Sequence, residues 1–271
     1  MSATTWLVVV LSVVPMGVGG CNRSHTRFKH PRFMSEADCA ACLQVALDAE
    51  GPDARREAVV HIARTSRLTS DIVVRALITI ARTDRSESVR LAAVRALAKA
   101  GVPGVIEPLI EIVSAPDETK VVSDPRVGVV RRAALEGLDA LMARDELSDG
   151  QREVCHAAAI RLLNRHRSRD VRIAAAAFLR HFPAAATLTA LIDALEQRDF
   201  GVVYQSERSL MLLTGRTFDH DAAAWRQGLA ATDDPFEHAG RLDHELCPKE
   251  ESWWARTING TRQAFAGFRP K

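Results

Sequence analysis

Apolar and small residues recur in a nine-residue pattern along the middle of the chain. They occupy positions 1, 5, 8 and 9, as in Val89-Arg90-x-x-Ala93-x-x-Ala96-Leu97, and this spacing marks one stripe of an α-helix. Copies of this repeat pattern start at Ala54, Val89, Val130, Val171 and Val202. Because these starts are 31 to 41 residues apart, the pattern predicts a stack of similar helical units.

A chain breaker and a second apolar segment follow three of these copies. Proline cannot continue a helix but fits the first turn of the next one, so Pro103 and Pro183 mark new helices. Ser148, with Gln151 three residues later, has the form of a capping box. The second helices are therefore predicted over residues 105–113, 154–163 and 188–195.

The repeat pattern resembles the first helix of HEAT and HEAT-like (bilin-lyase-type) repeats, over roughly residues 50–230. An irregular helical bundle is the alternative, but it gives no reason for arginine to recur at position 2. The resemblance implies an all-α fold, a right-handed α-α superhelix in which four to five helical pairs form a solenoid. We expect this solenoid over residues 35–232, with a cap at its C-terminal end. The low aromatic content, 5%, also disfavours a core built from sheets.

The first 21 residues have the composition of a bacterial lipoprotein signal peptide. An apolar segment, 6–14, precedes Val18-Gly19-Gly20 and then Cys21, in a pattern that resembles a lipobox. The resemblance implies removal of residues 1–20, lipidation of Cys21 and a place in the cell envelope, on a membrane outside the cytosol. Two features depart from the usual pattern: no Lys or Arg precedes the apolar segment, and Val18 stands in place of Leu. An uncleaved transmembrane anchor is therefore the main alternative.

Residues 21–34 form a basic tether with no acidic residue. Its cations, Arg23, Arg27, Lys29 and Arg32, either attract anionic lipid headgroups or merely keep a linker soluble. Ser35 and Asp38 then have the spacing of a helix N-cap, which predicts a helix that runs to about Ala49.

Lipidation of Cys21 would leave four cysteines, Cys39, Cys42, Cys155 and Cys247, in an oxidising compartment. Cys39 and Cys42 share a helical face, so we expect either a packed thiol pair or a structural disulfide. A redox or metal-binding module is the alternative, but Cys39 lies about a turn inside the expected helix, away from the N-terminal dipole that lowers a thiol pKa. Cys155 falls in an apolar stripe and is predicted to be core.

The sequence offers little else for chemistry. It has no nucleophile elbow, phosphate-binding glycine loop or zinc-protease motif, so we predict no catalytic, cofactor-binding or metal-binding residues. A lyase-like enzyme stays an alternative only because distant residues can meet in the fold. The net charge is +2, with 36 Lys and Arg against 34 Asp and Glu, which argues against a nucleic-acid partner.

Residues 212–225 resemble a closing segment found after HEAT-like arrays in some bacterial envelope proteins. Gly215 can end a helix in the left-handed conformation, and Asp221 can cap a short helix that carries Trp225. Phe218 and Trp225 would then cover the apolar end of the stack, as a terminal repeat requires. A ligand-binding role for this aromatic pair is the alternative.

Residues 233–271 form a C-terminal extension rich in aromatic and basic side chains. It carries Trp253, Trp254, Phe265 and Phe268 among several arginines, and these side chains either dock on a membrane or partner or fold back on the solenoid. Together these features predict a non-catalytic, membrane-anchored scaffold, an adaptor that binds a protein or cell-envelope component through the solenoid surface. The partner is not identified.

Overall fold

A computed structural model of the chain describes residues 34–116 and 127–241. Predictions that concern Cys21, the basic tether, Cys247 or residues 242–271 lie outside this part. The described residues form eleven α-helices and no strand. None of these helices has the length and apolar character that a membrane crossing requires.

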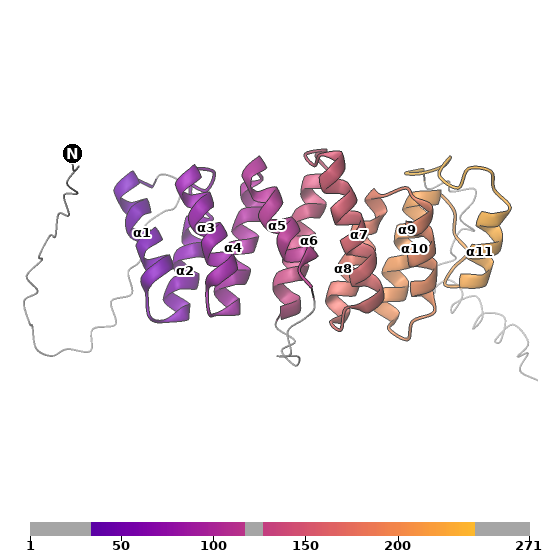
Figure 1. The fold of residues 1–271 in the computed structure, drawn as a ribbon, viewed down its shortest axis with the longest axis horizontal. Coiled ribbons are helices and arrows are strands. Elements are labelled where there is room, and N and C mark those ends of the chain that lie inside the picture. Colours follow the sequence, from indigo (N-terminus) through magenta and orange to yellow (C-terminus); the bar gives the residue numbers. More distant parts are fainter. Residues whose placement is uncertain (1–33, 117–126, 242–271) are drawn as a thin grey trace, which may run out of the picture. The chain divides into compact units, whose positions relative to one another are not determined.

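The helices follow one another in sequence order along the stack (Figure 1). Their bounds are α1 Glu36–Asp48, α2 Pro52–Ile62, α3 Asp71–Thr83, α4 Glu87–Ala100, α5 Ile106–Ser114, α6 Val127–Met142, α7 Asp149–Arg165, α8 Arg169–Phe178, α9 Ala185–Leu195, α10 Phe200–Thr214 and α11 Ala222–Ala230. Two single-turn 3₁₀ helices, Pro103–Val105 and Leu179–His181, precede α5 and follow α8.

The helices form two layers. Every copy of the repeat pattern falls in an even-numbered helix, and we call α2, α4, α6, α8 and α10 the repeat layer. Each repeat-layer helix packs on the one before it, and the odd-numbered helices form the second layer. The all-α solenoid with five helical pairs is therefore confirmed, whereas the handedness of its superhelix stays a prediction.

The pairing of helices differs from the sequence prediction. The repeat pattern was assigned to the first helix of each pair, yet the closely packed hairpins are α1 with α2, α3 with α4, α5 with α6, α7 with α8 and α9 with α10. The repeat pattern thus lies in the second helix of its pair. The prediction was wrong because periodicity reports which face of a helix is buried and not which neighbour covers it.

Repeat positions 1, 5, 8 and 9 are buried in the copies that begin at Val89, Val130, Val171 and Val202. The copy at Ala54 is the exception, because Ala54 is exposed and His61 is only half-buried. This copy lies in α2, the first repeat-layer helix among the described residues, which packs on α4 in that layer.

Arginine at position 2 ties three of the repeat-layer helices, α2, α4 and α6, to the end of the helix before each. Arg55, Arg90 and Arg131 donate hydrogen bonds to the C-cap carbonyls of α1, α3 and α5, at 2.7, 2.7 and 2.9 Å respectively. The last carbonyls of a helix have no partner within the helix and attract cations, so a recurring arginine satisfies one of them in each of these three hairpins. This contact explains why arginine recurs.

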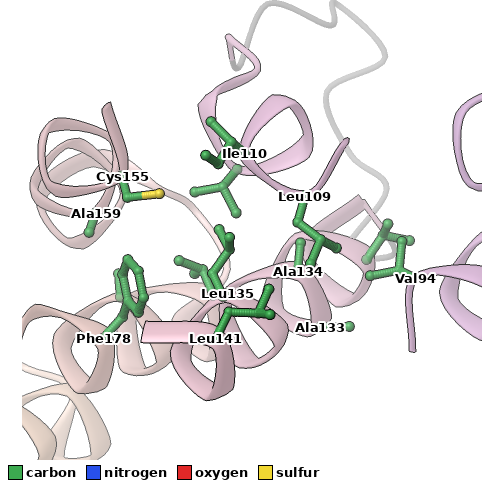
Figure 2. Packing of buried hydrophobic residues seen from close by; sticks show 14 of the residues in the cluster. Val94, Leu109, Ile110, Ala133, Ala134, Leu135, Leu141, Cys155, Ala159 and Phe178 are labelled. Carbon is green, nitrogen blue, oxygen red and sulfur yellow. The ribbon is translucent and has the colours of Figure 1, made fainter. Parts of the chain in front are cut away.

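Small residues allow the repeat-layer helices to approach closely. Ala93, Ala134 and Ala175 are fully buried, and a Cβ added to Gly137 would lie 2.7 Å from the Cβ of Ala98 on α4. Figure 2 shows Leu109 of α5 over Ala134 of α6, near Val94 of α4. A larger side chain at these positions would push the helices apart.

The predicted helix starts are largely confirmed. Ser35 caps α1 through the Asp38 amide, and Ser148 with Gln151 forms the capping box of α7. Pro103 begins the 3₁₀ turn before α5. Pro183 instead lies one residue ahead of Ala184, the N-cap of α9, so it ends the preceding turn and does not begin the helix.

Candidate protein-binding surface

Position 3 of the repeat pattern faces solvent on the repeat layer. It is occupied by Arg132 in α6, Ile173 in α8 and Tyr204 in α10, none of which is buried. Because these helices are successive neighbours in the layer, equivalent positions present their side chains on one surface. We call this surface, on α6, α8 and α10, the repeat face.

A groove of about 380 Å³ lies on the repeat face between α6 and α8. Ile173, Ala174 and Ala177 contribute apolar surface to it from α8. The remaining lining residues are Arg132, Leu135, Glu136, Asp139 and Asp170. Three carboxylates and one guanidinium therefore line an otherwise apolar groove, which suits apolar side chains that carry positive charge beside them.

Ion pairs hold the charged side chains of this groove in place. Arg132 lies 3.3 Å from Glu136, and Asp139 lies 2.7 Å from Arg180 and 2.9 Å from His181. Burial by itself would raise the pKa of Asp139, but the hydrogen bond to His181 and the charge of Arg180 outweigh it and lower the pKa. Asp139 is thus an ionised, oriented carboxylate at neutral pH.

An exposed aromatic pair extends the repeat face onto α10. The side chains of Phe200 and Tyr204 are 70% and 51% exposed, and their ring centroids are 6.2 Å apart. His220 stacks on Phe200 at 5.7 Å and lies 3.0 Å from the Glu207 carboxylate. Exposed aromatic rings that neighbours hold in place are typical anchors of protein interfaces.

Ile173 connects the groove to this aromatic pair. A Cβ added to Gly201 would lie 2.9 Å from the Ile173 Cδ1, so the α10 backbone passes directly beside the groove. Gly201 lies in the first turn of α10, between Phe200 and Tyr204 in sequence. The groove and the aromatic pair therefore form one continuous surface.

The closing segment has the local geometry that the sequence suggests. Gly215 ends α10 with φ +67°, and the Asp221 carboxylate accepts hydrogen bonds from the amides of Ala223 and Ala224. Helix α11 packs on α9. These local features place the segment at the end of the described stack, and its role as a cap stays a proposal.

The aromatic pair of the closing segment is packed edge to face. The ring centroids of Phe218 and Trp225 are 5.0 Å apart, and Trp225 is fully buried. The Trp225 Nε1 donates to the Asp219 carbonyl oxygen at 2.8 Å. Gly228 leaves the space for Phe218, because a Cβ there would overlap the Phe218 ring. A buried and satisfied indole favours packing over ligand recognition for this pair.

Cys39 and Cys42 are buried and form no disulfide with each other. Burial raises the pKa of the Cys39 thiol, although the charge of Arg67 opposes this effect. Burial also raises the pKa of Cys42, and the neighbouring Cys39 adds to it. Both thiols are therefore protonated and poorly nucleophilic at neutral pH, which argues against a redox role.

Cys155 lies in the core, as predicted from its apolar stripe. Burial raises the pKa of its thiol to about 12. Figure 2 shows its sulfur directed from α7 into the packed interior. Within residues 34–116 and 127–241, no three His, Cys, Asp or Glu side chains come together in a way that suits a metal ion.

Neither the groove nor the aromatic pair was identified from the sequence. A signal existed for part of it: Tyr204 is the only tyrosine in the chain and stands at position 3, which is not one of the apolar positions that define the repeat pattern. The groove left no such signal, because its walls come from two helices and only their packing brings the walls together.

Comparison with known families supports the same architecture. Residues 40–139 match the model of HEAT repeats, a stretch that runs from α1 into α6. These residues are similar to HEAT repeats. Beyond this match, α7 to α10 continue the HEAT-type pairing of helices. No curated protein matches the chain. HEAT repeats form extended surfaces for protein interaction, so a scaffold is the class of function that this architecture supports.

Proposed function

We propose that this HEAT-repeat protein is a non-catalytic scaffold at a membrane, where it binds a protein or another cell-envelope component through the repeat face. The observation that carries the proposal is the exposed pair Phe200 and Tyr204 beside an apolar groove. Apolar and aromatic side chains left in water favour burial against a partner. The groove, with its oriented carboxylates, adds selectivity for the side chain that enters it.

A binding experiment with matched variants tests the face. Tyr204→Ala and Ile173→Ser each remove one apolar contact from the repeat face, while Ile72→Ser changes an equally apolar side chain, 62% exposed on α3 of the second layer. The full chain is used to capture cell-envelope components after cross-linking. Capture should fall about tenfold with the first two variants and stay unchanged with the third. Equal capture by all three variants would exclude the repeat face.

The membrane anchor is the second part of the proposal. Small residues before Cys21 support cleavage there and lipidation of its thiol, and a lipid would hold the repeats outside the cytosol. Mass spectrometry of the wild-type protein should show an acylated N-terminal Cys21, and Cys21→Ala should abolish the acyl mass. Recovery of unacylated wild-type protein with residues 1–20 attached would favour the transmembrane alternative.

The proposal that the protein is not a catalyst has two supports, the protonation state of its buried thiols and its similarity to HEAT repeats. Burial keeps the thiols of Cys39, Cys42 and Cys155 protonated, which leaves no activated nucleophile among them. HEAT repeats are an interaction architecture. Thiol reagents should therefore label these three cysteines slowly in the purified protein until it is unfolded. Rapid labelling of Cys39 in the folded chain would revive the redox alternative.

A further inference from the structure

The repeat face exposes to solvent a set of side chains that could contact a bound segment. Two of the three carboxylates that line its apolar groove are already in ion pairs, and the third, Asp170, is exposed in the first turn of α8. Beside it, Phe200 and Tyr204 expose aromatic rings on consecutive turns of α10. A matching occupant has aromatic or apolar side chains for the groove and for the two rings, and has cations near them.

The chain itself contains a segment with this chemistry. Residues 253–271 carry four aromatic side chains, two of the four Trp and two of the nine Phe. The same 19 residues contain four cations and no Asp or Glu: Arg256, Arg262, Arg269 and Lys271. A segment of this composition is complementary to the repeat face both in apolar character and in the sign of its charge.

The point where the described chain ends brings this segment within reach. The Gly240 amide donates to the Leu212 carbonyl oxygen at 2.9 Å, so the chain leaves the described part beside the C-terminal end of α10. The 15 residues of α10 span roughly 22 Å. The 12 residues that follow Arg241, up to and including Trp253, span up to about 40 Å when extended. Adjacent helix axes are about 8–10 Å apart, so this linker reaches both Tyr204 and the groove.

We propose that residues 253–271 dock on the repeat face of the same molecule, with their aromatic side chains against Tyr204 and in the groove between α6 and α8. The docked segment covers the surface that the proposed function assigns to a partner, and it therefore competes with that partner. Release of the segment then becomes a condition for binding. The inference rests on the proposed function only for this consequence, because docking itself requires no partner.

Photo-cross-linking within the purified full chain tests the docking directly. Phe265 is replaced by the photoreactive amino acid p-benzoylphenylalanine, and the cross-linked peptides are mapped by mass spectrometry on monomeric protein. Cross-links should concentrate on α6, α8 and the first half of α10. Cross-links confined to other helices, or found only between two molecules, would overturn the proposal.

Matched variants distinguish docking in the groove from non-specific contact of the C-terminal segment with the solenoid. Asp170→Arg reverses a charge at the groove, and Asp149→Arg makes the same change at an exposed first-turn position of α7, in the second layer. Cross-linking to the repeat face should fall about tenfold with Asp170→Arg and with Tyr204→Ala, and should persist with Asp149→Arg. Equal yields from the two charge variants would contradict docking through the groove.

A second measurement does not depend on the cross-linker. Replacement of Trp253, Trp254, Phe265 and Phe268 by alanine should increase hydrogen exchange in α8 and at the start of α10, while exchange in α3 stays unchanged. The same variant should bind the captured partner more strongly, because its competitor is gone. If docking is observed but neither the wild-type chain nor the four-alanine variant captures a partner, only the proposed function fails. If a partner binds the repeat face and no docking is observed, only this inference fails.

Discussion

The cores of the two ends of the described stack are built from different kinds of side chain. Helices α1 to α6 contain no Phe, Tyr or Trp, and their core consists mainly of Ala, Val, Leu and Ile, together with Cys39, Cys42 and Met142. Helices α8 to α11 and their connections bury Phe178, Phe182 and Trp225. The core of the first region is thus built from small and aliphatic side chains, whereas large aromatic rings take part in the core of the second.

The comparison also extends to the surface. In the first region, position 2 arginines bond to the C-cap carbonyls of the preceding helices, as described for Arg55, Arg90 and Arg131. In the second, Arg172 instead lies 3.9 Å from the Asp199 carboxylate. The exposed aromatic pair of the repeat face also occurs only in the second region of the described residues. The regular repeats thus provide a scaffold, and the aromatic end carries the features expected of a binding site.

The largest effect is expected at Trp225. If the core of the aromatic end relies on large rings, the stability of that end should depend strongly on this side chain. Trp225→Ala removes a fully buried side chain and should cost about 3–5 kcal/mol of unfolding free energy. Damage should spread into α9 and α10, because terminal units support their neighbours. Hydrogen exchange tests this effect. Wild-type protection over residues 171–213, together with loss of partner binding, would make the closing segment a recognition site and reject its role as a cap.

Gly215→Val tests whether the backbone conformation at the end of α10 contributes to the stability of the aromatic end. Gly215 has φ +67°, and a Cβ there would lie 2.6 Å from backbone oxygens of His238 and Arg241. The left-handed conformation alone costs a side-chain-bearing residue about 1–2 kcal/mol, and the contact adds to it. Gly150→Val is the control, because it has open space in the first turn of α7. Equal melting temperatures for the two variants would contradict the strain at Gly215.

Overpacking tests the regular repeats. Ala134→Leu and Ala175→Leu enlarge side chains with no exposed surface between helices, and each should cost about 1–3 kcal/mol. Ala140→Leu makes the same change at an exposed position of α6 and should leave the melting temperature unchanged. If the buried and exposed variants melt alike, close helix contact is not what holds these repeats together.

The smallest effect is a change in acid sensitivity at Asp84. Burial would raise the pKa of its carboxyl, but hydrogen bonds from Arg55 and from the Ser86 amide outweigh burial and lower the pKa. The ionised carboxylate thus stabilises the fold above the unfolded pKa of about 4, and this stabilisation is lost as pH falls through the folded value.

Asp84→Asn should therefore lower the melting temperature at pH 7 and reduce its further fall between pH 7 and pH 3. Asp48→Asn, at an exposed position in the last turn of α1, serves as the control and should retain the acid sensitivity of the wild-type protein. A fall with Asp84→Asn as steep as that of the wild type would show that Asp84 does not contribute to the acid response.

Much of the local structure was accessible from the sequence because it depends on neighbouring residues. The buried stripes beginning at Val89 and Val171, the capping box at Ser148 and the left-handed end of α10 at Gly215 all follow from contacts within a few positions. Such contacts need only the helical period and the donors and acceptors of one chain segment. For the same reason, the copy at Ala54 was misjudged, since its exposure depends on what lies beside the first pair.

The sequence by itself determined that this chain forms stacked amphipathic helices with defined ends. Only the tertiary structure decided which helices pair, where position 2 arginines donate, and that Ile173 and Tyr204 share one surface with a groove. The groove and the shared surface join residues about 30 or more positions apart, such as Ile173 and Tyr204, and the approach of their helices is governed by side-chain volume at helix contacts. A pattern with a short period contains no such distances, because many arrangements of the same helices bury the same stripes.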